Sequence, residues 1–224
     1  MSPEAGSSEL HAALVDALGA DVVSGRLAAG HVLTLDGLGA QYEVSRSVAR
    51  EAIRVLESMG MVASRRRVGI TIQPAEAWNV FDPRLVRWQL DSGDRAALLG
   101  ALHELRRGVE PAAAALAARR ADPHQCRTLA GAVSDMAVHG RAGDTRAYLS
   151  ADNVFHRTLL EASGNGLFRA LNALIELTAQ DRSEPSDRAT IALHDDVARA
   201  IRERDEAAAE AAMRALVDAP AQAG

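Results

Sequence analysis

The sequence predicts a mainly α-helical protein in two parts, an N-terminal helical module with a small β-hairpin and a C-terminal all-α helical bundle. Three observations predict this fold class. Apolar residues recur at helical spacing through most of the chain, only residues 61–72 offer short strand-like segments, and a stretch with prolines and both tryptophans over 74–93 separates the two parts. With 224 residues, 48% of them apolar, the chain is long enough for two cores.

The first helix is predicted over residues 8–24, and Gly25 follows it as a stop signal. Its predicted buried side consists of Leu10, Leu14, Ala17 and Leu18. A short second helix comes next, with Leu38 and Tyr42 on its buried side. The tight turn EVS ends this helix, and Ser45 is placed to cap the third helix by accepting a backbone N–H.

The third helix lies within EVSRSVAREAIRVLESMGM, residues 43–61. Its predicted buried stripe consists of Val48, Ala52, Val55, Leu56 and Met59. Arg46, Arg50 and Arg54 are four residues apart and share another face. Residues 41–70 hold six arginines and three glutamates, a local charge of +3 in a chain of net charge −5. Such a patch is typical of nucleic-acid binding, and the alternative is a solvated face of Glu–Arg pairs.

Two short strands are predicted after Gly60, over residues 61–63 and 69–72, around an arginine-rich bend. Two short helices joined by a tight turn, with spaced arginines on the second, form a helix-turn-helix whose second helix fits the major groove of DNA. The hairpin would be a wing beside that helix. The sequence therefore predicts a winged helix-turn-helix over residues 8–73.

A linker is predicted over residues 74–93, with a short amphipathic helix that buries Leu85, Val86 and Trp88. Trp78 and Trp88 are predicted to be packing anchors between domains rather than ligand contacts, because large aromatics dominate interface burial. The third segment, 94–220, is predicted to be the all-α bundle.

Within the bundle, one helix runs from residue 94 past a proline at 111, and the next begins at the cap Asp122 with Pro123 in its first turn. Further helices are predicted over 144–162, 166–182, 187–203 and 205–218.

Asp152 and His156 are four residues apart, so both project from one side of a helix. A carboxylate and an imidazole at this spacing can bind one divalent ion such as Zn, Ni or Mn, and His194 is the best candidate for a third ligand. The alternatives are a hydrogen-bonded surface pair, a polar cavity, or a helical metal-dependent hydrolase that activates water at an open coordination position. The hydrolase interpretation lacks a recognisable base motif nearby.

Residues 10–73 resemble the winged helix-turn-helix of the GntR family of bacterial transcription regulators. The resemblance is carried by Gly25, Gly30, Leu33, Leu38, the run VSRSVAREAIRVLESMGMV and the bend RRRVG. It implies that Arg46 and Arg50 contact operator bases and phosphates, while Arg54 can merely solvate the helix. It further implies DNA contacts by Ser45, Ser47, Arg66, Arg67 and Gly69. Here Thr34 and Leu35 precede Asp36 at the start of the second helix, and Gly39 stands where alanine is usual.

The rest of the chain resembles the FCD domain, the ligand-sensing bundle of FadR-like members of that family. The matching segments are ELRRGVEPAAAALAARRA, DNVFH, SGN and HDDVARAIRERDEAAAEAAM. The resemblance implies that Asp152, His156 and His194 are metal ligands and that Arg106 helps to hold an effector carboxylate. Leu216 stands where the family has its last ligand histidine. A metal would therefore have three protein ligands.

The segment WNVFDPRLVRWQL resembles relatives that respond to sugar acids. The resemblance thus implies a cytoplasmic DNA-binding regulator, a repressor, that binds a pseudo-palindromic operator as a homodimer. Its effector would be a small carboxylate, with a sugar acid as candidate, bound by Arg106, Asp152, His156 and His194. The alternatives are a fatty acyl or other organic acid effector, an architectural DNA-binding protein, or the helical hydrolase.

Three sequence features favour a cytoplasmic protein without a membrane partner. The chain has a single cysteine, Cys126, it has no run of eighteen consecutive apolar residues, and its N-terminal segment has no Lys or Arg.

Overall fold

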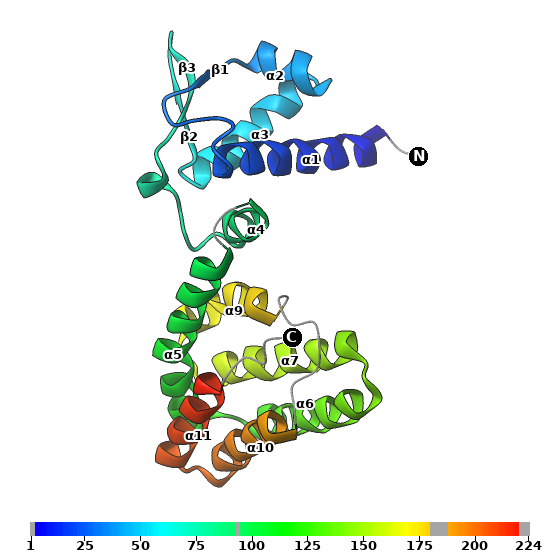
Figure 1. Cartoon of the computed structure of the whole chain (residues 1–224), viewed down its shortest axis with the longest axis vertical. Helices are drawn as coiled ribbons and strands as arrows, with labels where there is room; N and C mark the ends of the chain where they lie inside the picture. The colour runs from blue at the N-terminus through cyan, green and yellow to red at the C-terminus, as the bar shows by residue number, and fades with distance from the viewer. Residues whose placement is uncertain (1–2, 93–94, 180–187, 220–224) are drawn as a thin grey trace. The chain divides into compact units, whose positions relative to one another are not determined.

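The computed structural model describes residues 3–92, 95–179 and 188–219 and divides the chain into two compact units, Met1–Leu98 and Leu99–Gly224. Figure 1 shows helices in both units and one small sheet near the N-terminus. The predicted fold class, mainly helical with a hairpin wing and a C-terminal bundle, is confirmed. In the described residues, no helix is long and apolar enough to cross a membrane.

The first unit begins with three helices and contains a three-stranded antiparallel sheet (Figure 1). The helices are α1 (Pro3–Val23), α2 (Leu35–Tyr42) and α3 (Arg46–Ser58). The strands are β1 (Val32–Leu33), β2 (Val62–Arg65) and β3 (Gly69–Ile72), in the order β1-β3-β2. In the hairpin, Val62 lies opposite Ile72 and Arg65 opposite Gly69. The two-residue strand β1 was not predicted, because its register with β3, Val32 opposite Thr71, is a long-range pairing.

The buried face of α3 differs from the predicted stripe. Ala49 and Ile53 are buried together with Ala52, Leu56 and Met59. Val48 and Val55, which were predicted to be buried, are only half-buried. From Ala49 onward, the residues that face the core are therefore spaced at i, i+3, i+4 and i+7, a regular helical stripe that shares Ala52, Leu56 and Met59 with the predicted one. On α1, Leu10 is exposed, contrary to prediction, and Val15 and Val22 join Leu14 and Leu18 in the core.

Side-chain caps set the turn between α2 and α3. Thr34 accepts a hydrogen bond from the backbone N–H of Gly37, so the departure from the family pattern at this position still yields a cap. Ser45 caps α3, as predicted, by accepting from the N–H of Val48. Tyr42 donates its hydroxyl hydrogen to Asp21 on α1 over 3.0 Å, which ties the end of α2 to the first helix.

The segment after the wing belongs to the first unit and packs against α1. It forms a 3₁₀ turn (η1, Ala75–Ala77) and the helix α4 (Pro83–Ser92). The ring of Trp88 lies against Gly19 of α1, and its indole N–H donates to Asp16 over 3.2 Å. Trp78 donates to the carbonyl of Gln73. Both tryptophans pack within the winged unit, where Trp88 is buried in the apolar core and Trp78 is partly buried against it.

In its described residues, the second unit consists of helices joined by short turns and contains no strand. Its helices are α5 (Arg95–Arg120), α6 (Pro123–Ala142), α7 (Thr145–Ala162), α8 (Gly166–Ala170), α9 (Asn172–Ala179), α10 (Arg188–Glu203) and α11 (Glu206–Asp218). The helix predicted over 166–182 is two helices, α8 and α9, and positions 180–182 lie outside the described residues, as does 187. Helix α5 continues through Pro111, and α6 begins with a full capping box of Asp122 and Gln125.

Helix α7 is central to the bundle, since it packs against α6, α8 and α9 (Figure 1). Tyr148, Phe155 and Leu159 on this helix are fully buried in the main apolar cluster. The same buried helix carries Asp152 and His156, so the apolar packing of α7 fixes the position of two polar side chains at the centre of the unit.

Candidate functional site

The N-terminal part of α3 carries the predicted DNA-contacting side chains, and all of them are exposed. Arg46 lies 3.1 Å from the Asp36 carboxylate on α2, and Arg54 lies 2.8 Å from Glu51 on its own helix. Within the described residues, Arg50 makes no ion pair, so its guanidinium is available to a phosphate or a base edge. Both Ser45 and Ser47 lie at the start of the helix, where backbone N–H groups favour an anion.

The wing is a tight basic turn. Arg66 and Arg67 are exposed at its tip, and Arg67 has a left-handed backbone conformation with φ of 67°. Gly69 follows with φ of 111°, and a Cβ atom there would lie 2.9 Å from the carbonyl oxygen of Leu33. Only glycine satisfies both conditions without strain, so Gly69 lets β3 approach β1 while the arginines stay outside the sheet.

Asp152, His156 and His194 meet inside the second unit, although His194 comes from α10 and the other two from α7. One ligand atom from each lies within 4.8 Å of the others, and all three residues are buried. The sequence prediction that these three side chains come together is therefore reproduced by the fold.

The arrangement around His194 places two acceptors face to face. Nδ1 of His194 lies 2.8 Å from the carbonyl oxygen of Thr190, and a carbonyl oxygen can only accept, so Nδ1 carries the proton. In the neutral ring Nε2 then presents a lone pair, 3.2 Å from Oδ1 of Asp152. A carboxylate oxygen and a ring lone pair repel at this distance unless a cation or a proton lies between them. The donor set thus fits a divalent ion, which these three residues would hold.

Arg106 and Glu110 on α5 adjoin this triad and are also buried. Arg106 donates to Glu110 from Nε and to the Thr178 hydroxyl from Nη1, each over 3.1 Å. Its Nη2 lies 3.1 Å from Nε2 and 3.5 Å from Nδ1 of His156, so it faces the imidazole ring and not a single ring nitrogen. Oε1 of Glu110 lies 2.9 Å from Nδ1 of His156. Sequence reasoning missed Glu110, although its position four residues after Arg106 was a signal for a paired charge.

The electrostatics of the cluster are set by burial and by close opposite charges. Burial raises the pKa of Glu110, but the Arg106 guanidinium and His156 together lower it to about 2. Burial also raises the pKa of Asp152, but the two histidines hold it well below its usual range. For His156, burial lowers the pKa, but the Glu110 and Asp152 carboxylates raise it overall. Burial lowers the pKa of His194, which favours its neutral, ligating form.

Leu216, where the family resemblance places a last ligand histidine, is buried in the apolar cluster of the bundle. A leucine there offers packing and no ligand atom. Three protein ligands would leave coordination positions of a divalent ion open to water or to an effector oxygen.

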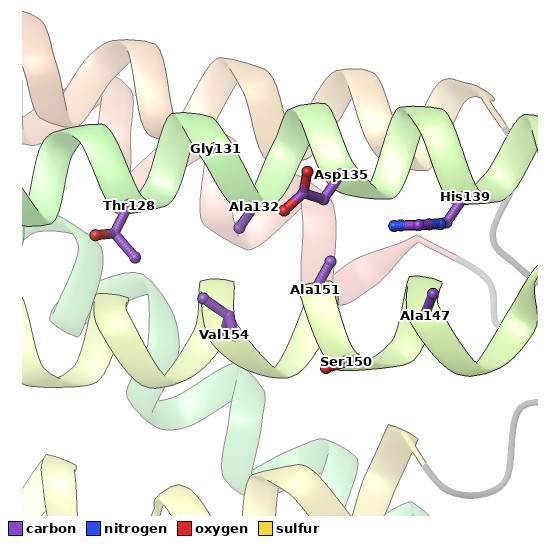
Figure 2. A pocket seen from close by; sticks show the side chains of 9 residues that line it. All are labelled: Thr128, Gly131, Ala132, Asp135, His139, Ala147, Ser150, Ala151 and Val154. Carbon is purple, nitrogen blue, oxygen red and sulfur yellow. The ribbon is translucent and has the colours of Figure 1, made fainter.

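A pocket of about 340 Å³ lies between α6 and α7. Figure 2 shows the side chains that line it. Its lining consists of Thr128, Gly131, Ala132, Asp135, His139, Ala147, Ser150, Ala151 and Val154. Asp135 and His139 repeat the spacing of Asp152 and His156 but are not buried, and in the described part of the chain they have no third ligand. This pocket contains none of the buried triad.

A basic winged helix-turn-helix and a helical bundle that encloses metal-type ligands define a ligand-binding, DNA-binding regulator. Family comparisons agree: residues 10–72 match "Bacterial regulatory proteins, gntR family", and residues 101–219 match "FCD domain". The chain therefore belongs to the GntR family of bacterial transcription regulators, in the branch that carries an FCD domain. These are regulator families, which confirms the regulator interpretation over the helical hydrolase.

The relatives include proteins that match nearly the whole chain. The galactonate operon transcriptional repressor of Escherichia coli (strain K12) is 28% identical over 212 residues, 91% of this chain and 92% of that protein. The uncharacterized HTH-type transcriptional regulator YieP of the same organism is 27% identical over 220 residues, 96% of each. Among solved structures, a Streptococcus agalactiae GntR protein is 26% identical with a TM-score of 0.54, over 92% of this chain and 96% of that one.

Proposed function

We propose that this regulator is a cytoplasmic repressor that binds a pseudo-palindromic operator as a homodimer and responds to a small carboxylate bound in the bundle beside a divalent cation. The observation that carries the proposal is the buried cluster of Asp152, His156 and His194 with Arg106 next to it. A guanidinium and a cation in one buried site match an anionic, oxygen-rich ligand, because charge-assisted bonds offset its desolvation. The similarity to a galactonate operon repressor favours a sugar acid.

The cation is proposed to be Zn, Ni or Mn, held by Asp152, His156 and His194. A bound divalent ion supplies open coordination positions for effector oxygens. Arg106 would contact the effector carboxylate, and the three ligand residues would contact its remaining oxygens. This polar lining favours a small hydroxylated carboxylate over a fatty acyl ligand, which needs apolar surroundings.

The DNA contacts are proposed to come from α3 and the wing. Arg46 and Arg50 would read base edges and phosphates, Ser45 and Ser47 would contact phosphate at the start of α3, and the wing would approach the minor groove. The wing residues assigned to this role are Arg66, Arg67 and Gly69. Effector binding changes operator affinity only if the effector binds one arrangement of the dimer more tightly than another. The affinity for the effector and the affinity for the operator are then linked.

The test begins with an operator selected from random DNA by the full chain. Arg46→Ala and Arg50→Ala should each abolish specific operator binding, measured by fluorescence anisotropy, while zinc binding and dimerisation persist. Normal operator affinity in both variants would refute the DNA assignment.

Arg106→Ala should keep operator binding but lose the response to D-galactonate and other sugar acids in a thermal-shift screen with added zinc. An unchanged ligand titration of Arg106→Ala would refute the effector assignment.

A further inference from the structure

The two strands of the wing are held unequally. The strand order is β1-β3-β2, so β3 has a partner on each side, while β2 is an edge strand. Ile70 of β3 is buried in the core of the winged unit. In β2 only Val62 is buried, and Ser64 and Arg65 are exposed. The half of β2 that leads to the basic turn therefore has no buried side chain to hold it.

Glu57 on α3 reaches this outer half of β2. Its Oε1 accepts a hydrogen bond from the backbone N–H of Ser64 over 2.7 Å, seven positions further along the chain. That N–H lies on the outer edge of β2, where no described strand pairs with it. Ser64 directly precedes Arg65, whose carbonyl oxygen accepts from the N–H of Val68 and closes the basic turn. Glu57 thus joins α3 to the wing immediately before that turn.

The base of the hairpin is fixed independently of this contact. The backbone N–H of Met61 donates to the carbonyl oxygen of Leu56 on α3 over 3.0 Å, and that of Gln73 donates to Met61 over 2.8 Å. These bonds fix where the wing begins. The contact of Glu57 restrains how the outer half of β2 lies against α3.

The charge of Glu57 does not explain its place on a DNA-binding unit. On the same helix Glu51 pairs with Arg54 over 2.8 Å, whereas Glu57 forms no ion pair in the part of the chain that the structure describes. A negative charge on this unit opposes the binding of phosphates. The hydrogen bond to Ser64 gives the carboxylate a role as an acceptor instead.

We propose that Glu57 is a positioning residue, which holds the wing against α3 so that Arg66 and Arg67 reach the DNA backbone while α3 lies in the major groove. Two contact surfaces bind one duplex together only if their relative orientation is fixed before binding, because ordering them during binding costs free energy. The inference rests on the proposed function, since it requires the DNA contacts of the wing.

Operator binding by the full chain, measured by fluorescence anisotropy at several salt concentrations, tests this role. Glu57→Ala should weaken binding about 10-fold and lower the slope of log affinity against log salt by about 1 to 2, because each phosphate contact contributes about 0.9 to that slope. Loss of a negative charge alone would strengthen binding, so the two explanations predict opposite signs. Unchanged or tighter binding by Glu57→Ala would overturn the inference.

Glu57→Gln separates the hydrogen bond from the charge. The amide oxygen of glutamine still accepts from the Ser64 N–H, so this variant should keep the salt slope of the wild type and bind at least as tightly. A loss equal to that of Glu57→Ala would contradict the positioning role. Glu51→Ala is the matched control, because it removes the same charge from α3 at a residue whose hydrogen bond goes to Arg54. An equal loss in this control would also overturn the inference.

A double-mutant cycle distinguishes the wing from general damage to the fold. In a protein that carries both Arg66→Ala and Arg67→Ala, Glu57→Ala should weaken binding by less than about 2-fold further, because the contacts it positions are already gone. A further loss as large as in the wild-type background would show damage to α3 and would overturn the inference.

The same cycle separates this inference from the proposed function. Wild-type affinity and salt slope in the protein with Arg66→Ala and Arg67→Ala would refute the proposed DNA contacts of the wing and this inference together. Weaker binding by that protein, with no effect of Glu57→Ala in the wild-type background, would overturn the inference alone.

Discussion

Five titratable side chains from three helices lie buried together in the second unit, and this concentration is costly for a protein core. They are Arg106, Glu110, Asp152, His156 and His194. Desolvation of a buried ion pair often cancels its Coulombic gain, so apolar residues of similar volume would stabilise the fold at least as well. The cluster is therefore explained by ligand binding better than by stability.

The role of Asp152 can be tested by an isosteric change. Asp152→Asn keeps the volume but removes the carboxylate that faces both histidines, so we expect zinc affinity to fall by about 100-fold or more, because an amide is a poor zinc ligand. Calorimetric titration measures the effect. Asp135→Asn is the control, since Asp135 is an exposed carboxylate in the pocket of Figure 2. Equal losses in the two variants would contradict a zinc site at Asp152.

Asp36 holds Arg46 in an exposed ion pair and places a negative charge near the recognition face. Asp36→Asn should tighten operator binding about 2- to 5-fold, because an exposed ion pair contributes at most about 1 kcal/mol. Anisotropy titrations at two salt concentrations measure the change. Glu9→Gln removes the same charge from an exposed site on α1 and should have little effect. Weaker binding by Asp36→Asn would mean that the pair orients Arg46 productively.

At the scale of elements, α4 is anchored on α1 by the fit of Trp88 over Gly19. A Cβ atom at Gly19 would lie 2.3 Å from the indole ring, so a larger side chain fits only if the ring or the helix moves. Both Leu85 and Trp88 belong to the apolar core of the winged unit. The linker helix is thus part of the DNA-binding unit rather than a free spacer.

Gly19→Ala should destabilise the first unit. Overpacking costs about 1–3 kcal/mol, while the better helix propensity of alanine returns at most about 1 kcal/mol. Tryptophan fluorescence during urea unfolding reports this unit, because both tryptophans lie in it. Gly100→Ala on α5 meets no atom within 4 Å and should leave that midpoint unchanged. An unchanged midpoint in Gly19→Ala would contradict the tight α1–α4 contact.

At the scale of the whole molecule, the candidate DNA contacts lie in one unit and the candidate cation site in the other. The two functions therefore rest on separate cores. A ligand that binds only one core raises the free energy of unfolding of that core by mass action. The gain is about 2.7 kcal/mol when the free ligand concentration is a hundred times the Kd.

Zinc should accordingly raise the unfolding temperature of the second unit and leave that of the first unchanged. Circular dichroism reports the helices of both units, while tryptophan fluorescence reports the first unit, so the two signals should separate on addition of zinc. Zinc-dependent shifts of equal size in both signals would mean that the two units unfold as one.

Part of the candidate site could be predicted from the sequence. The i, i+4 pair Asp152–His156 is local, and motif resemblance placed His194 beside it. Glu110 could not be assigned in the same way, since its contact with His156 joins residues on α5 and α7 that only the bundle brings together. The pairing of Arg106 with His156, 50 positions apart, is likewise a product of packing.

The sequence by itself determined the elements whose causes are local. Apolar periodicity defined the helices, the caps Ser45 and Asp122 defined where two of them begin, and the spaced arginines on α3 indicated DNA. Tertiary structure alone decided which face of α3 is buried, that Trp88 belongs to the winged core, and that Arg106 and Glu110 lie beside His156. The physical reason is that hydrogen bonds and caps act within a few residues, whereas burial depends on which distant surfaces exclude water together.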